Sequence, residues 1–373
     1  MCSCVCFFNC LVYLMFCVKC KCLNFRFAFM GYYNVFSKPL DVQVVFPDVD
    51  REHRVEKKPV DVKLKKAWAL AQKQKEQELD GSRFKYRSYN VFQAPNSCHT
   101  QSLQVGKYQI GVCHAQGRRP SQEDQHLATS FSLRLPKGEI YPVQLFGVFD
   151  GHGGSEASLY MEKHLQNELM KTLIHFHPEG KLTDEGIWNA LKLAFVNLSD
   201  RFKQLDQNSG TTATVAMILD GKLWTANVGD SRTILEDSSK GTFQLSEDAK
   251  PSDTRYKKGI EKRGGSVEFH GDTPRINGIL AVGRAVGDGS VGPGVSSRPK
   301  ITKIDLSQIH SGSHLVLACD GIYDVASTRQ VGHALRQKSF FRKSPISVAQ
   351  NLVFSAYRAG SQDNLSALVV RIP

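Results

Sequence analysis

Residues 145–154 read LFGVFDGHGG, and here an almost continuous apolar run ends at Asp150 in a carboxylate, followed by an imidazole among three glycines. An apolar run without polar alternation is typical of a strand that is buried on both faces. Glycines directly after the run allow the backbone to approach a bound ligand closely. An isolated Asp-Gly pair is common in ordinary turns, whereas the complete Asp-Gly-His-Gly-Gly exit is far more specific. The stretch therefore predicts a buried strand that carries functional groups at its end.

Two further aspartates stand beside apolar runs far along the chain. Asp320 closes the apolar part of HLVLACDGIYD (residues 314–324), and Asp363 precedes the apolar part of SQDNLSALVV (residues 361–370). A hard divalent cation needs several oxygen ligands close together, and carboxylates at neighbouring strand ends supply them. The pattern makes the chain a candidate metal-dependent hydrolase.

Short apolar runs separated by turn residues dominate the chain from about residue 107. They predict strands at residues 108–115, 142–149, 212–219, 222–228, 278–282, 314–319 and 365–372. Asp220-Gly221 is a favoured two-residue hairpin turn, which makes at least one pair of strands antiparallel. Apolar residues at helical spacing predict helices at residues 155–176, 186–205 and 347–357. Ser327 and Gln330 have the spacing of a capping box that starts a fourth helix. We expect an α+β fold of two stacked antiparallel β-sheets flanked by helices on both outer faces.

Composition divides the 373 residues into three parts. Residues 1–37 form a Cys-rich apolar leader, with seven of the ten cysteines in the first 22 residues, that is expected to be disordered or membrane-associating. Residues 38–105 form a basic N-terminal extension, within which residues 59–80 are rich in helix formers and predict a surface helix. Residues 106–373 carry the strands and all the candidate functional residues.

The apolar stretch at residues 5–18 is shorter than the ~20 residues that a membrane-spanning helix needs. Lys19 and Lys21 follow this stretch, whereas a secretory signal begins with positive charge. Three alternatives remain: reversible S-acylation of the clustered cysteines, a cleaved signal, or a segment with no role. We expect a cytoplasmic protein, with weak membrane association through residues 1–22 as an alternative.

The formal net charge is +12, and residues 1–105 contribute +7 of it, from 16 Lys and Arg against 9 Asp and Glu. No basic cluster with interleaved aromatic residues is present, so nucleic-acid binding is not expected and a metal-dependent nuclease is disfavoured. Cys113 and Cys319 lie inside apolar runs, which argues against a disulfide framework and favours a reducing compartment.

The chain resembles the metal-dependent protein serine/threonine phosphatases of the PPM family, type 2C. The resemblance covers roughly residues 106–373 and rests on seven motifs that follow one another in the family's order. They are GRRPSQED (117–124), FDGHGG (149–154), SGTTA (209–213), NVGDSR (227–232), NGILAVGRAVGD (277–288), ACDGIYDV (318–325) and SQDN (361–364).

The resemblance implies a site with two Mg²⁺ or Mn²⁺ ions. It assigns Asp150 as the bridging ligand, the carbonyl of Gly151 as a ligand of one ion, and Asp320 and Asp363 as ligands of the other. Two such ions lower the pKa of a bridging water, and the resemblance implies that this water or hydroxide attacks the phosphate directly, without a phospho-enzyme.

Further residues receive supporting roles from the same resemblance. Glu123 and Asp124 would hold coordinated waters or a metal edge. Asp230 and Asp324 match a third, weaker metal position, although each is also placed to cap a turn.

Two basic side chains match the residues that the family uses to handle the phosphate. Arg119 matches the phosphate-binding arginine, whose planar fork suits two phosphate oxygens. His152 matches the general acid that protonates the leaving seryl or threonyl oxygen, with the orientation of water as the alternative role.

The sequence departs from the family at Ala249, where histidine is usual, and at Gly283, where serine is common. Neither position is a metal ligand, so these changes bear on substrate handling. The basic segment 252–265 is expected to form a flap beside the site and to favour phosphopeptides with acidic surroundings. The expected partners are phosphorylated proteins, and a monomer is expected.

Two hypotheses from different classes follow. The first is hydrolysis of phosphoserine and phosphothreonine in proteins. The alternative is a catalytically weak or inactive protein that keeps the fold as a binding or regulatory module. The presence of all the ligand candidates together with Arg119 and His152 favours catalysis.

Overall fold

The computed structural model describes residues 60–61, 94–206, 208–336 and 344–373. The predicted leader at residues 1–37 lies outside the described residues, as does most of the predicted helix at residues 59–80. Within that segment, Val60–Asp61 form a strand, β1, that pairs in parallel with β15 (Lys300–Asp305), so the helix prediction is wrong there. None of the helices in the described residues is long and apolar enough to cross a membrane.

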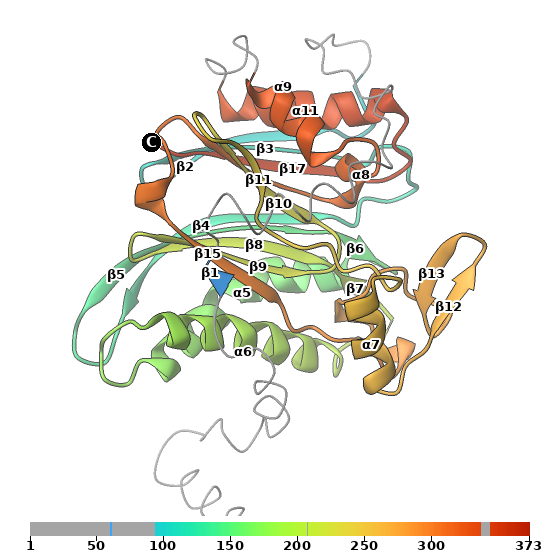
Figure 1. The fold of residues 1–373 in the computed structure, drawn as a ribbon, viewed down its shortest axis with the longest axis horizontal. Helices are drawn as coiled ribbons and strands as arrows, with labels where there is room; N and C mark the ends of the chain where they lie inside the picture. The colour runs from blue at the N-terminus through green and yellow to red at the C-terminus, as the bar shows by residue number, and fades with distance from the viewer. Residues whose placement is uncertain (1–59, 62–93, 207, 337–343) are drawn as a thin grey trace, which may run out of the picture. The chain divides into compact units, whose positions relative to one another are not determined.

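The two central layers are six-stranded sheets that stack face to face (Figure 1). The first sheet has the order β1, β15, β9, β8, β5, β4, and every pair in it except β1 with β15 is antiparallel. Its other strands are β4 (Gln125–Arg134), β5 (Ile140–Phe149), β8 (Ala213–Leu219) and β9 (Lys222–Val228).

The second sheet is antiparallel throughout and has the order β11, β10, β16, β17, β3, β2. Its strands are β2 (His99–Val105), β3 (Tyr108–Ala115), β10 (Arg232–Asp237), β11 (Gly241–Gln244), β16 (His314–Ala318) and β17 (Leu365–Arg371). The last strand in the chain, β17, lies between β16 and β3 near the middle of this sheet. The sheet also includes residues 99–105, which the sequence analysis assigned to the N-terminal extension.

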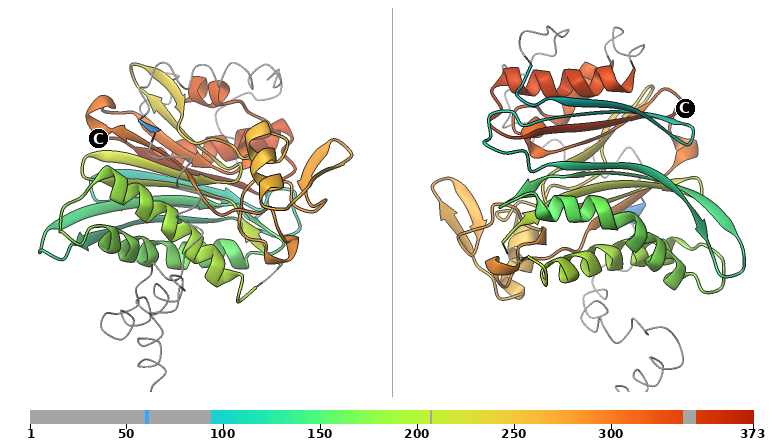
Figure 2. Two further views of the ribbon diagram at one scale, coloured as in Figure 1. Left: turned by 60° about the horizontal axis from the view of Figure 1, so that its bottom comes forward. Right: turned by 180° about the vertical axis from the view of Figure 1, so that it is seen from behind.

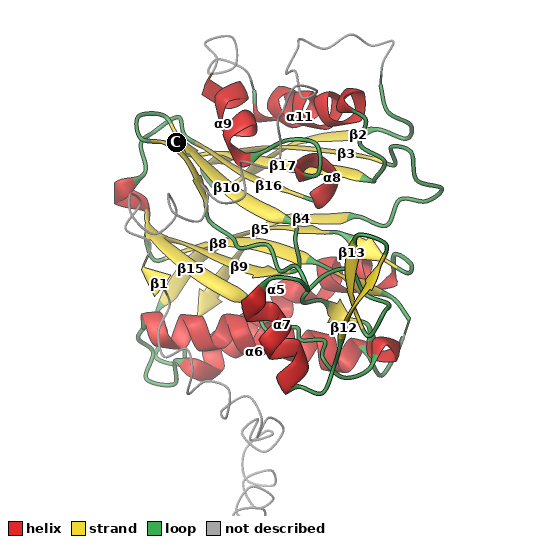
Figure 3. Cartoon of the chain, turned by 45° about the vertical axis from the view of Figure 1, so that its right-hand side comes forward, coloured by secondary structure: helices red, strands yellow, loops and turns green. Residues whose placement is uncertain are grey.

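Helices cover the outer face of each sheet, as Figure 2 and the secondary-structure colours of Figure 3 show. On the first sheet lie α5 (Glu156–Phe176) and α6 (Asp184–Phe202); on the second lie α8 (Asp320–Tyr323), α9 (Thr328–Arg336) and α11 (Pro345–Ala359). The α11 backbone passes directly over Gly111 of β3, where an added Cβ would lie 2.0 Å from the nitrogen of Ile346. These layers confirm the α+β fold with helices on both outer faces.

The side chains of β5 explain why its sequence is apolar without alternation. Val143, Leu145 and Phe149 pack towards α5 and α6, while Phe146 and Val148 pack into the core between the two sheets. Both faces of the strand are therefore buried, as the sequence predicted, and the strand end that carries Asp150 is held from two sides.

The smaller elements gather around the end of the sheets that carries the candidate site. They are β6 (Gly151–His152), β7 (Gly210–Thr211), β14 (Val286–Gly287), α7 (Thr254–Lys262), β12 (Val267–His270), β13 (Thr273–Ile276) and the 3₁₀ turn at Gly289–Val291. A second 3₁₀ turn, at Leu306–Gln308, lies at the other end, where the nitrogen of Leu306 donates to the carbonyl oxygen of Gly221. The hairpin of β12 and β13 and the helix α7 project beside β6 and β7 (Figure 1).

Several local predictions are confirmed. Asp220 and Gly221 both have positive φ, 51° and 70°, as the tight hairpin between β8 and β9 requires. Ser327 and Gln330 form the reciprocal capping box at the start of α9, with distances of 2.8 and 3.2 Å. One predicted strand is wrong: residues 278–282 form a turn and a single bridge from Leu280 to Ile276.

Candidate active site

The site begins where β5 passes into the short strand β6 at Asp150. The carbonyl of Asp150 accepts hydrogen bonds from the nitrogen of Thr212, at 2.9 Å, and from Oγ1 of Thr211, at 3.0 Å. At Gly151 an added Cβ would lie 2.4 Å from the carbonyl oxygen of Glu123, so only glycine fits. The backbone at the candidate ligands is therefore fixed by hydrogen bonds and by close packing.

The other two aspartates reach the same place from neighbouring strands of the second sheet. Asp320 is the first residue of α8, directly after β16, and Asp363 lies just before β17. Because β16 and β17 are antiparallel, the end of one and the start of the other share an edge. Gly321 permits this closeness, since a Cβ there would lie 2.1 Å from the carbonyl oxygen of Asn364.

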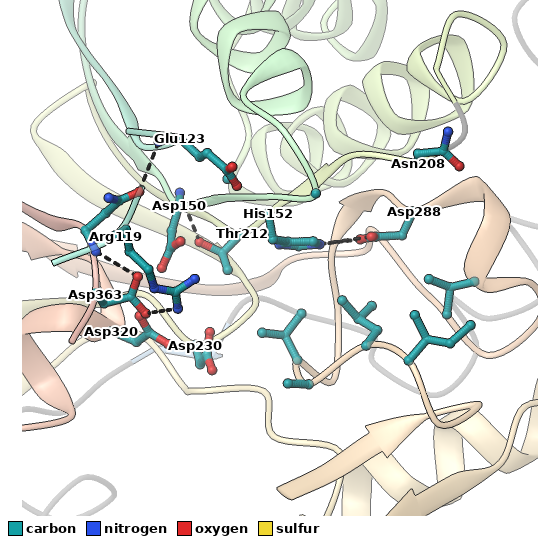
Figure 4. Close-up of a pocket in the computed structure, with 18 of the residues that line it drawn as sticks. Arg119, Glu123, Asp150, His152, Asn208, Thr212, Asp230, Asp288, Asp320 and Asp363 are labelled. Carbon is teal, nitrogen blue, oxygen red and sulfur yellow. Dashed lines mark hydrogen bonds and ion pairs between the residues drawn. The ribbon is translucent and has the colours of Figure 1, made fainter. Parts of the chain in front are cut away.

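These residues line one cleft of about 480 Å³ (Figure 4). The predicted residues on its walls are Arg119, Glu123, Asp150, Gly151, His152, Asp230, Asp320 and Asp363. Two predicted residues do not line it. Asp124 is fully buried behind the cleft, where Ser366 Oγ donates to it at 2.7 Å, and Asp324 follows α8 one turn beyond Asp320.

The carboxylates repel one another strongly. Burial and the charges of Asp320 and Asp124 raise the pKa of Asp150 well above its usual range, and burial with the charges of Asp230 and Asp324 does the same to the pKa of Asp320. A bound cation would relieve this repulsion.

Carboxylate oxygens are the ligands that hard divalent cations prefer, and two buried ones, Oδ1 of Asp124 and Oδ1 of Asp230, have no hydrogen-bond partner. The donor set thus fits Mg²⁺ or Mn²⁺ in type and charge. Across the described ranges, no three His, Cys, Asp or Glu side chains are arranged closely enough to hold an ion as they stand. Cationic side chains pair with two of the carboxylates instead: Arg119 with Asp363, and Lys250 with Asp230.

A loop at residues 116–123 brings Arg119 to the cleft. The side chain of Arg119 is 54% exposed, and its Nη2 donates to Oδ2 of Asp363 at 2.8 Å (Figure 4). Asn364 fastens this loop, because its Nδ2 donates to the carbonyl oxygens of Gln116 and Ser121, at 2.9 and 2.8 Å. Its Oδ1 also accepts from the nitrogen of Glu123, at 3.0 Å. Hydrogen bonds therefore tie the candidate phosphate ligand to the segment that carries a candidate metal ligand.

His152 faces Asp288 rather than the carboxylate cluster (Figure 4). Nε2 of His152 lies 2.9 Å from both carboxylate oxygens of Asp288, and the Asp288 side chain is only 3% exposed. Burial alone would lower the pKa of His152, but the contact with Asp288 and the charges of Asp230 and Glu123 outweigh it and raise that pKa. Asp288 therefore favours the protonated, proton-donating form of the imidazole.

A family model places the chain among known proteins: the model described as "Protein phosphatase 2C" matches residues 108–365. The chain belongs to the protein phosphatase 2C family. The match spans every element that brings the predicted residues together, from β3 to the start of β17.

Relatives and solved structures agree with this membership. The "Probable protein phosphatase 2C 76" of Arabidopsis thaliana is 35% identical over 277 residues, which cover 71% of this chain and 59% of the relative. The chain thus spans about three fifths of that relative's length. A "Structure of a C.elegans sex determining protein" aligns with a TM-score of 0.57 at 29% identity, covering 71% of this chain and 64% of that one. A "Crystal structure of a phosphatase from a pathogenic strain Toxoplasma gondii" aligns with a TM-score of 0.60 at 25% identity, covering 73% and 95%.

Sequence reasoning missed three residues of this protein phosphatase 2C site. They are Asp288, which holds His152; Lys250, which pairs with Asp230; and Asn364, which fastens the Arg119 loop. Asp288 and Asn364 stand inside motifs used for the resemblance, and Lys250 follows Ala249 at a recognised departure. Each residue was visible in the sequence, but its partner was not, because the partners lie 20 to 248 residues away along the chain.

The basic segment 252–265 does not form the expected wall of the cleft. No residue of the segment 252–265 is among those that line the cleft in the described part of the chain. The segment forms α7 and its flanking turns, and the wall of the cleft on this side comes from residues 279–282 instead.

Proposed function

We propose that this chain hydrolyses phosphoserine and phosphothreonine in proteins in a reaction that depends on Mg²⁺ or Mn²⁺. The observation that carries the proposal is the convergence of Asp150, Asp320 and Asp363 on one cleft together with Arg119 and His152. Carboxylates supply the metal ligands, a guanidinium suits a phosphate, and an imidazole suits a leaving oxygen.

The bound ions would be held by Asp150, the carbonyl of Gly151, Asp320 and Asp363, with Asp230 and Asp324 at a third, weaker position. Divalent cations in such a site neutralise the phosphate oxygens and lower the pKa of a coordinated water. The carboxylates would fix the positions of the cations, and the close backbone contacts at Gly151 and Gly321 hold the residues that carry these carboxylates near one another.

Arg119 and His152 then act on the substrate itself. Arg119 is half exposed and reaches the cleft from the fastened loop, so its fork can hold two phosphate oxygens beside the carboxylates. His152 keeps Nε2 bound to Asp288, which leaves Nδ1 to carry the proton that the leaving seryl or threonyl oxygen takes up.

Purified full-length protein should hydrolyse p-nitrophenyl phosphate and a phosphothreonine peptide when Mn²⁺ or Mg²⁺ is supplied, and EDTA should abolish both activities. Asp150→Asn should lower kcat by at least about 100-fold, because a metal ligand is lost while the fold is kept. Asp272→Asn is the matched control, since Asp272 is exposed and does not line the cleft. Turnover without metal would contradict the proposal. Phosphopeptide binding without hydrolysis would favour the binding-module alternative.

A further inference from the structure

One wall of the cleft is mainly aliphatic, although Arg275 and Ser290 also line the cleft, whereas the opposite wall is crowded with carboxylates. Residues 279–282, with the sequence Ile-Leu-Ala-Val, and Val291 line the same cleft as Asp150 and His152. In Figure 4 a group of side chains without polar atoms lies below the His152–Asp288 pair. The wall therefore adjoins the position of the leaving group.

Hydrogen bonds from two neighbouring side chains hold this wall in place. Asn277 joins its two segments, because Nδ2 donates to the carbonyl oxygens of Val291, at 2.9 Å, and of Pro293, at 2.8 Å. Arg275 fixes the tip from below, where Nη1 donates to the carbonyl oxygen of Ile279 at 2.6 Å.

Behind the wall, α7, β13 and the segment 280–291 share a small apolar core, which we call the flap core. Leu280, Val282 and Val291 pack there against Ile260 and Ile276, so each wall residue except Ile279 and Ala281 is anchored. Ile279 is different: its side chain is 57% exposed while it lines the cleft. A large apolar side chain left open beside a reaction centre indicates a surface that is covered when substrate binds.

We propose that Ile279 and its neighbours form a subsite for an aliphatic side chain next to the phosphorylated residue of the substrate. The inference rests on the proposed function, because the phosphate must be seated at the Asp150 cluster for its neighbour to reach this wall. An uncharged polar neighbour would lose water against these apolar side chains without gaining a partner, whereas an aliphatic one buries area on both sides. Substrates are therefore selected by apolar flanking residues, in contrast to the acidic surroundings expected from the basic segment 252–265.

The test uses phosphothreonine peptides of equal length that differ only in the two residues flanking the phosphothreonine, which are leucine or serine. With Mn²⁺, the full-length protein should show a kcat/KM for the leucine peptide about fivefold above that for the serine peptide. The factor is modest because the subsite is open on one side.

Ile279→Ser should bring the leucine-to-serine ratio close to one, and the ratio cancels any general loss of activity. Phe269→Ser is the matched control, because Phe269 is 62% exposed on the neighbouring strand β12 but does not line the cleft, and it should keep the wild-type ratio. A ratio of one in the wild type, or an unchanged ratio in Ile279→Ser, would overturn the subsite while leaving the phosphatase proposal intact. Failure to hydrolyse every peptide and p-nitrophenyl phosphate would overturn the proposed function, and the subsite with it.

Discussion

At the scale of single residues, the His152–Asp288 pair depends on Gly210, because any side chain at that position would clash with both partners. An added Cβ at Gly210 would lie 2.1 Å from Oδ2 of Asp288 and 2.4 Å from Nε2 of His152. Asp288 itself has a φ of 58°, a left-handed conformation that Asp and Asn tolerate better than most residues. The imidazole is thus positioned by a carboxylate that the backbone holds in an uncommon conformation.

Replacement of Asp288 tests this positioning. Asp288→Asn keeps the size and suits the left-handed φ, but it removes the charge that orients and protonates His152. We expect kcat for a phosphothreonine peptide to fall by about 10- to 100-fold. The loss should be smaller for p-nitrophenyl phosphate, whose leaving group needs no proton. Equal losses for the two substrates would mean that Asp288 does not act through proton donation.

The pair also shows what residue patterns cannot reveal. The motif around His152 was enough to propose a role for it, because the chemistry of an imidazole after a buried strand is local. Its partner is 136 residues away, and only the pairing of β6 with β7 and of β7 with β14 brings the two together. For the same reason Asn364, whose partners Gln116 and Ser121 lie more than 240 residues away, was not assigned.

At the scale of elements, the turn between β10 and β11 is built around one buried carboxylate. Asp237 has no exposed surface, and it accepts hydrogen bonds from the backbone nitrogens of Ser239, Lys240 and His310. Burial alone would raise the pKa of Asp237, but these hydrogen bonds and the His310 ring lower it to about 2. The ionised form therefore stabilises the folded protein.

Asp237→Asn should reveal this stabilisation through its pH dependence. Because the folded pKa lies below the usual value of about 3.8, the stabilisation is complete above pH 4 and is lost as pH falls towards 2. We expect the substitution to lower the free energy of unfolding by about 2 kcal/mol at pH 7, with the difference shrinking below pH 4. Urea unfolding at several pH values measures it. A difference that stays constant down to pH 3 would contradict the argument, and Asp272→Asn should show none.

Buried strands could be predicted from the sequence, whereas a half-exposed edge strand could not. β5, β8, β9, β16 and β17 were predicted from apolar runs, because each is buried on one or both faces. The edge strand β4 was missed, since its residues 125–134 are mostly half-exposed and mix polar with apolar side chains. The strand predicted at residues 278–282 was wrong, because the apolar side chains of this segment line the cleft and pack into the flap core instead.

At the scale of the whole molecule, the crowded carboxylates couple metal binding to stability. The metal-free protein carries the mutual repulsion of Asp150, Asp320 and their neighbours, and a cation that binds only the folded state relieves it.

Thermal unfolding should therefore respond to metal. With Mn²⁺ at about 100 times its Kd, the protein should gain about 3 kcal/mol, which raises Tm by several degrees. Asp150→Asn should be more stable than the wild type without metal and should gain less from Mn²⁺. The baseline is the Tm of each protein in Ca²⁺-free buffer with EDTA. An equal rise in Tm for the wild type and Asp150→Asn would mean that the stabilising ion binds elsewhere.

The position of β17 sets the order in which this site can come into existence. Asp363 immediately precedes that strand, and β17 itself fills the gap between β16 and β3 in the second sheet. A growing chain on the ribosome can pair most of the first sheet early, but it has neither the middle of the second sheet nor one of the proposed ligands until residues 363–371 have left the exit tunnel. The proposed site is therefore incomplete until β17 has joined the second sheet, and a chain shortened before residue 363 should lack both this central strand and one proposed metal ligand.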